Sequence, residues 1–119
     1  MLLFLRNVTL FAVMMANCGF AFAQETTSAN YVMAGCRIAV GPVEGFANAD
    51  QPSALSAGVC LGIVEGIRSA SGLCVPDEVV LGQAVLVIMK YIDERPERLH
   101  ERFSLLTREA LQATFPCKE

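Results

Sequence analysis

The sequence predicts an all-α fold, a small four-helix bundle held by two disulfides. Two observations lead to this prediction. Four segments between residues 29 and 114 repeat apolar residues at a spacing of three or four, which is the period of one helix face. Four cysteines lie in the same part of a short chain that begins with the pattern of an export signal. An even number of cysteines in such a chain is typical of a disulfide framework.

Residues 1–23 have the pattern of a secretory signal peptide, which is not part of the fold. One cation, Arg6, precedes an uncharged apolar stretch, and the Ala-Phe-Ala tripeptide at 21–23 fits the small residues that signal peptidase accepts. Cleavage there leaves a single helical domain, residues 24–119, in an oxidising compartment that we expect to be the bacterial periplasm. Cys18 offers the alternative of a lipid anchor, although the asparagine before it matches a lipidation site poorly.

Charge and the length of the apolar runs exclude two classes of partner. Removal of the signal peptide leaves eight lysines and arginines against twelve acidic residues, a net charge of −4. An acidic chain lacks the basic patch on which nucleic-acid binding depends, so we expect neither nucleic acid nor anionic lipid as a partner. The longest later apolar run, residues 79–89, is about half as long as the roughly 20 residues of a membrane span. We therefore expect no membrane association after cleavage.

The first two helices are expected at residues 29–40 and 54–71. A segment rich in glycine and proline, residues 41–52, separates them. Ser53 is a candidate N-cap of the second helix, and Gly72 is a candidate C-terminal cap. The apolar residues that recur every four positions in the second helix are expected to face the core: Leu55, Val59, Ile63 and Ile67.

Three glycines, Gly58, Gly62 and Gly66, share one face of the second helix. Glycine inside a helix costs about 1 kcal/mol relative to alanine, so a row of three needs a physical reason. Small residues allow a second helix to approach closely. The interpretation that we favour is close packing inside the chain, and the alternative is a contact face for a partner or a second subunit.

The third and fourth helices are expected at residues 78–94 and 97–114, on either side of Pro96. The third is apolar almost all round, which predicts a central position in the core. Its β-branched residues would also permit a strand, but its length and its three-to-four spacing favour a helix. The fourth has one apolar face and one charged face.

The four cysteines that remain after cleavage, Cys36, Cys60, Cys74 and Cys117, allow three pairings. About 21 Å of helix separates Cys60 from Cys74, far more than the roughly 7 Å between the Cα atoms of a disulfide. This excludes Cys60–Cys74, and with it Cys36–Cys117. We prefer Cys36–Cys60, which joins the first two helices as an antiparallel hairpin, together with Cys74–Cys117. The pairing Cys36–Cys74 with Cys60–Cys117 stays open.

The sequence shows no arrangement typical of an enzyme or a metal site. The one histidine, His100, lies in a charged segment and is interpreted as a solvated residue. The cysteines have neither zinc-ligand spacing nor a C-x-x-C redox pair. We therefore expect no enzymatic activity, no catalytic residue, no metal and no cofactor.

Three carboxylates, Glu94, Glu97 and Glu101, alternate with arginines. We interpret them as a solvated, ion-paired helix face, with contact to a basic partner as the alternative.

Four short motifs occur in order along the chain: CLGIVEGI, CVPDEVVLGQ, YIDERPE and ALQATFPC. Together they resemble the Rap/Tai-type immunity proteins of type VI secretion systems, over residues 54–118. Besides Cys60, Cys74 and Cys117, the residues that match this family pattern include Gly62, Gly66, Pro76, Gly82, Gln83, Tyr91, Pro96, Phe115 and Pro116.

The resemblance implies a periplasmic, disulfide-bonded all-α protein that is often a homodimer. It also implies a function, which is to bind a peptidoglycan amidase toxin and block its active-site groove. A rigid domain loses little entropy on binding, and an acidic surface suits a basic enzyme. The alternative is a stand-alone periplasmic stress or chaperone-like helical protein with no toxin partner.

Overall fold

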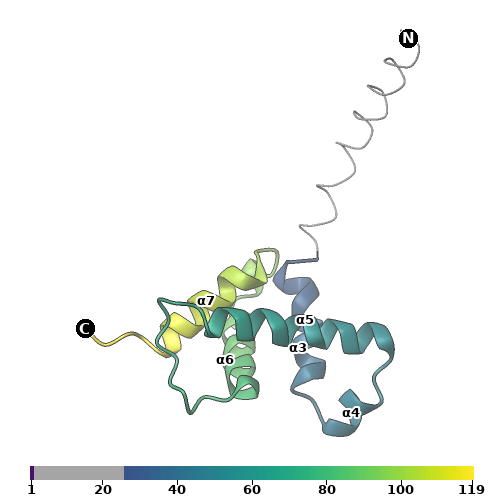
Figure 1. Cartoon of the computed structure of the whole chain (residues 1–119), viewed down its shortest axis with the longest axis horizontal. Coiled ribbons are helices and arrows are strands. Elements are labelled where there is room, and N and C mark those ends of the chain that lie inside the picture. Colours follow the sequence, from purple (N-terminus) through teal and green to yellow (C-terminus); the bar gives the residue numbers. More distant parts are fainter. Residues whose placement is uncertain (2–25) are drawn as a thin grey trace.

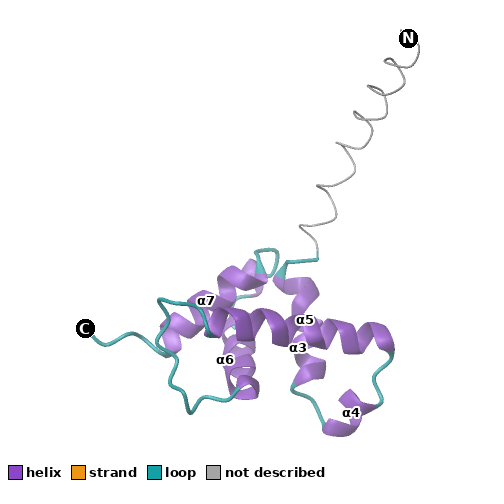
Figure 2. Ribbon diagram, in the orientation of Figure 1, coloured by secondary structure: helices purple, strands orange, loops and turns teal. Residues whose placement is uncertain are grey.

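The computed structural model describes Met1 and residues 26–119, and within this part the chain forms helices and no strand (Figure 2). The elements are α3 (Ala29–Ala39), α4 (Val43–Ala47), α5 (Gln51–Arg68), α6 (Leu81–Asp93), the 3₁₀ helix η1 (Pro96–Arg98) and α7 (Phe103–Thr114). The predicted all-α class with two disulfides is confirmed. The predicted signal peptide, including Cys18, lies outside the described residues.

The four longer helices enclose one apolar core. Helix α5 runs across the molecule, α3 and α6 cross it, and α7 packs beside α6 (Figure 1). Each of the four helices contributes side chains with almost no exposed surface. The largest of these are Val32, Val64, Val85, Ile88, Ile92, Phe103, Leu106 and Leu111.

Helices α3 and α5 form the closest contact of the bundle. A β-carbon added at Gly35 would overlap the backbone carbonyl of Ser56, so glycine is required where these two helices meet. The next residue along α3, Cys36, forms a disulfide with Cys60 of α5, with Cα atoms 5.3 Å apart. Both cysteines are fully buried. Close backbone approach and a covalent bond therefore fix the same pair of helices.

Helix α5 begins earlier than predicted, because Asp50 and not Ser53 is its N-cap. The Asp50 carboxylate accepts a hydrogen bond from the backbone N–H of Ser53 at 2.9 Å, and hydrogen bonding with Ser53 lowers the pKa of Asp50. The helix ends at Arg68. Gly72 lies beyond its end, in the following turn, with a φ of 87° that favours glycine.

The predicted buried row of α5 is wrong in its rotation about the helix axis. Leu55 is 69% exposed, and the rest of the predicted row is half-buried. The fully buried row is Ala57, Cys60 and Val64. Cys60 must face α3 to form its disulfide, and this turns the neighbouring row inward. A four-residue repeat alone does not distinguish two adjacent rows on one helix.

The third segment is a helix, as predicted, but α6 begins at Leu81 because a turn precedes it. In this turn the N–H of Val79 donates to the carbonyl of Pro76 at 3.0 Å.

The predicted fourth helix is interrupted between η1 and α7. There the N–H of Phe103 donates to the carbonyl of Thr27, and the N–H of Ala29 donates to the carbonyl of Glu101, both at 2.9 Å. Pairing with the chain before α3 replaces the helical hydrogen bonds that would have continued the helix.

The second disulfide joins Cys74 to Cys117, with Cα atoms 5.1 Å apart. Cys74 lies in the connection between α5 and α6, and Cys117 follows the end of α7. Both cysteines are exposed, unlike the buried pair between α3 and α5. The structure therefore contains both disulfides of the preferred pairing.

Candidate functional site

The glycine row of α5 faces solvent. Gly58, Gly62 and Gly66 are all exposed, and a β-carbon added at any of them would meet nothing within 4 Å apart from its chain neighbours and the adjacent backbone of α5 itself. Close packing of this row inside the chain, the interpretation favoured from the sequence, is therefore wrong. The close approach lies at Gly35 on the opposing helix, a residue that the sequence did not single out.

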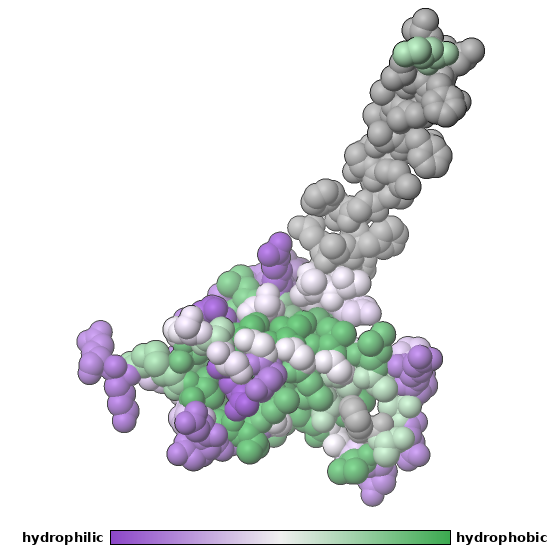
Figure 3. All heavy atoms as spheres, in the orientation of Figure 1, coloured by the Kyte–Doolittle hydropathy of each residue, from purple (hydrophilic) through white to green (hydrophobic). Residues whose placement is uncertain are grey.

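Apolar side chains flank the glycines on the same side of α5. Leu55 is 69% exposed, and Val59 is half-buried beside it. No charged residue occurs from Gln51 to Val64. Green and near-white spheres cover much of the band where α5 crosses the view (Figure 3). A solvated helix face normally carries charged and polar residues, so this uncharged surface, here called the α5 face (Leu55, Gly58, Val59, Gly62 and Gly66), is a candidate protein-binding surface.

The three carboxylates of the predicted acidic cluster do not form one open surface. Glu101 accepts two hydrogen bonds from Arg98, at 2.8 and 2.7 Å, and is half-buried. Glu94 and Glu97 are exposed, and Glu94 lies 3.8 Å from the guanidinium of Arg95. Of the three, Glu94 and Glu97 remain accessible to a partner.

Arg98 of η1 forms hydrogen bonds with two carboxylates, one of which belongs to α7. Besides Glu101, it donates to Glu109 of α7 at 2.6 and 3.1 Å. The hydroxyl of Tyr91 donates to the same Glu109 at 3.2 Å, and the guanidinium of Arg95 lies 3.7 Å from the centre of the Tyr91 ring. This network was not predicted, because Glu109 comes from the next helix and its spacing from Arg98 does not indicate a contact.

The Arg98 network predicts a loss of stability in acid. Hydrogen bonds from Arg98 hold the pKa values of Glu101 and Glu109 below their ordinary range. Carboxylates with a depressed pKa in the folded state stabilise it at neutral pH, and this contribution is lost as the pH falls through about 4.5 and below. Arg98→Met should therefore lower the melting temperature at pH 7 and lower it less at pH 3. Thermal melts of both proteins across this range test it, and an equal deficit at both pH values would contradict it.

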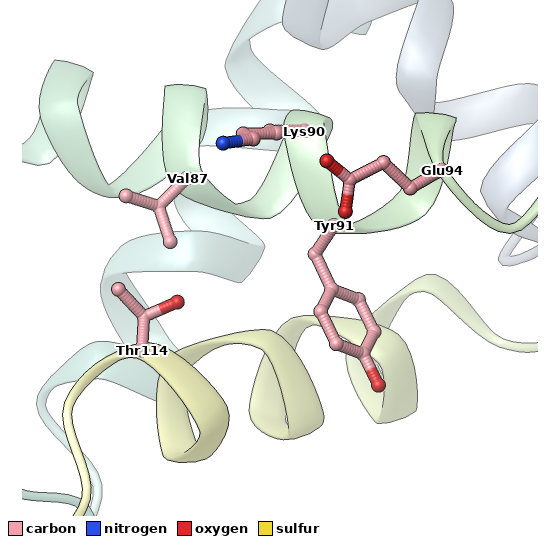
Figure 4. A pocket seen from close by; sticks show the side chains of 5 residues that line it. All are labelled: Val87, Lys90, Tyr91, Glu94 and Thr114. Atoms are coloured by element: carbon pink, nitrogen blue, oxygen red, sulfur yellow. The ribbon is translucent and has the colours of Figure 1, made fainter.

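A cleft of about 310 Å³ lies between α6 and α7. Val87 and Tyr91 of α6 and Thr114 of α7 line it, and Lys90 and Glu94 complete the lining (Figure 4). The Tyr91 ring points toward α7.

The described residues show few other features of a reactive site. They contain no group of three metal-ligating side chains. His100 is exposed in the turn before α7. No helix within this part of the chain is long and apolar enough to cross a membrane.

The matched motif residues are mostly at the surface rather than in the core. Gly62 and Gly66 belong to the α5 face, and Gly82 and Gln83 lie in the first turn of α6. Phe115 is half-buried against the core. Pro76, Pro96 and Pro116 are exposed, in or beside the connections between helices.

A model of the Rap1a immunity proteins matches residues 27–117 of the chain. This range begins just before α3 and ends at the second cysteine of the exposed disulfide, so it spans the whole helical domain. No curated protein and no solved structure matches the chain significantly.

Proposed function

Because the chain belongs to the Rap1a immunity protein family, we propose that it neutralises a toxin of a type VI secretion system. Its target is a peptidoglycan amidase, whose active-site groove it blocks sterically. It acts in the periplasm, after removal of residues 1–23 as a signal peptide. The observation that carries this proposal is the family match over the full helical domain.

The architecture supports inhibition by shape. Four helices share one core, and two disulfides join segments that are 24 and 43 residues apart. A domain constrained in this way loses little conformational entropy when it binds, so more of the contact energy appears as affinity. Nothing in such a mechanism requires a reactive side chain.

The test uses the mature chain and the amidase encoded in the neighbouring reading frame. We expect a stable complex by isothermal titration calorimetry and stoichiometric loss of peptidoglycan hydrolysis. Coexpression of both proteins in the periplasm should protect cells from lysis. Absence of binding together with unchanged hydrolysis would refute the proposal for that enzyme, and absence of any neighbouring amidase gene would weaken it.

Glu94 and Glu97 are the acidic residues that we propose as contacts for a basic toxin surface. Double substitution to lysine should weaken binding about tenfold, mainly through slower association, because exposed charges steer encounter. The effect should shrink as salt increases. Glu44→Lys in α4, also exposed, is the matched control and should bind as the wild type does. Unchanged association kinetics in the double variant would exclude this surface.

We further propose that the domain forms a homodimer through the α5 face. In an antiparallel arrangement Leu55 and Val59 of one copy fall opposite Gly66 and Gly62 of the other, so each of these apolar side chains meets a glycine. The uncharged face also lets an acidic chain meet its own copy without like-charge repulsion. Sedimentation equilibrium should show a dimer that Gly62→Leu converts to a folded monomer. A wild-type monomer at about 100 μM, or a dimer that survives Gly62→Leu, would exclude this contact.

A further inference from the structure

The two disulfides differ in their access to solvent. Cys36 and Cys60 have no exposed surface, whereas Cys74 and Cys117 are both exposed. Thiol–disulfide exchange requires an attacking thiolate to reach a sulfur atom, and exposed disulfides are the more labile ones. A reductant in solution can therefore reach only one of the two disulfides while the domain is folded.

The exposed disulfide joins two segments that lie outside the helices. One is the connection between α5 and α6, and the other is the chain after α7; the two lie at the same end of the molecule (Figure 1). The disulfide is the covalent link between these two segments.

The connection has a second anchor close to α6. The guanidinium of Arg68 donates to the carbonyl of Val79 at 2.6 Å, and the Val79 side chain is buried. Arg68 is itself fixed by Glu65, at 2.9 Å. Leu73, Val75 and Phe115 also pack against the core. Opening the disulfide would consequently loosen the exposed residues next to Cys74 and residues 116–119, and leave the start of α6 in place. The buried disulfide would still join α3 to α5.

We propose that Cys74–Cys117 is a reducible clamp, the site of modification by a dithiol reductant of the C-x-x-C class. A thiolate of the reductant attacks one sulfur and forms a mixed disulfide, while the other cysteine leaves as a thiolate and is protonated. The second thiol of the reductant then attacks the mixed disulfide and releases the remaining cysteine. The protein gains two electrons and two protons, and the dithiol becomes a disulfide. The domain thereby has two folded forms, closed and open.

Timed reduction of the mature protein tests the proposal. Dithiothreitol at pH 8 is the probe, iodoacetamide stops the reaction, and tryptic peptides are measured by mass spectrometry. Cleavage after Arg37, Arg68, Lys90, Arg108 and Lys118 places each of the four cysteines in its own peptide. Cys74 and Cys117 should be labelled at least about tenfold faster than the buried pair, with unchanged helical circular dichroism. Equal labelling of all four cysteines, or labelling only as helicity disappears, would overturn the proposal.

The double variant Cys74→Ser with Cys117→Ser fixes the open form. It should keep its helical spectrum and the buried disulfide, with faster amide hydrogen exchange confined to residues 70–75 and 116–119. Faster exchange throughout α3 and α5, or failure to fold, would show that the clamp is part of the core framework and refute the proposal. Neither experiment involves a toxin, so their outcomes are independent of the proposed immunity function.

Discussion

Gly35→Ala should destabilise the domain by about 3 kcal/mol, a large effect for one methyl group. The added β-carbon would overlap the carbonyl of Ser56, and a backbone group cannot move aside as a flexible side chain can. Separation of the two helices is also opposed by the adjacent disulfide between Cys36 and Cys60. The clash must therefore be relieved by distortion of α3 or α5, at the cost of packing in the core.

Thermal and denaturant unfolding measure this effect. A loss of about 3 kcal/mol corresponds to a fall in melting temperature of roughly 12–24 °C for a domain of this size. Gly45→Ala in α4 is the matched control, because open space surrounds that position and it lies outside the α5 face. This control should gain up to about 1 kcal/mol from the better helix propensity of alanine. A Gly35→Ala protein as stable as the wild type would show that the two helices do not approach this closely.

Removing the buried disulfide should destabilise the domain more than removing the exposed one, although it closes the shorter loop. Loop-closure entropy alone gives about 3.5 kcal/mol for the 24-residue separation of Cys36 and Cys60 and about 4 kcal/mol for the 43-residue separation of Cys74 and Cys117. Once the exposed disulfide is opened, we expect the segments that it joins to become mobile while the domain stays folded. Much of the loop-closure entropy is therefore regained without unfolding. The buried pair restrains two packed helices, and its removal also leaves a cavity.

Two double alanine variants, one for each disulfide, provide the comparison. We expect the buried-pair variant to lose more than about 3 kcal/mol in the free energy of unfolding. The exposed-pair variant should lose about 2 kcal/mol or less. Denaturant titrations at neutral pH measure both. The reverse order would mean that loop length determines these contributions, and that the segments around Cys74 and Cys117 stay ordered without their disulfide.

The fold class was predictable because it depends on patterns that are local in the sequence. The period of the apolar residues located α3, α5 and α6 to within a few residues, and the cysteine count with a helix-length argument led to the preferred pairing. The predicted acidic cluster was less informative. Its member Glu101 serves an intramolecular contact with Arg98, and only the folded chain shows this.

The remaining features depend on tertiary contacts that no local pattern contains. The rotation of α5 about its own axis follows from the position of Cys60 relative to α3. This rotation exposes the glycine row for which close packing was predicted. The break between η1 and α7 follows from backbone hydrogen bonds to residues about seventy positions earlier. Gly35 gave no signal because a single glycine in a helix is compatible with many environments.

The pairing between the chain before α3 and the start of α7 has a consequence for the order of assembly. Thr27 cannot receive its hydrogen bond until Phe103 has been made, so during synthesis from the N-terminus this junction stays open until α7 begins. The hairpin of α3 and α5 needs only the first half of the chain, and its cysteines can oxidise early. The second disulfide requires Cys117, which follows α7, so it can form only after all the helices have been made.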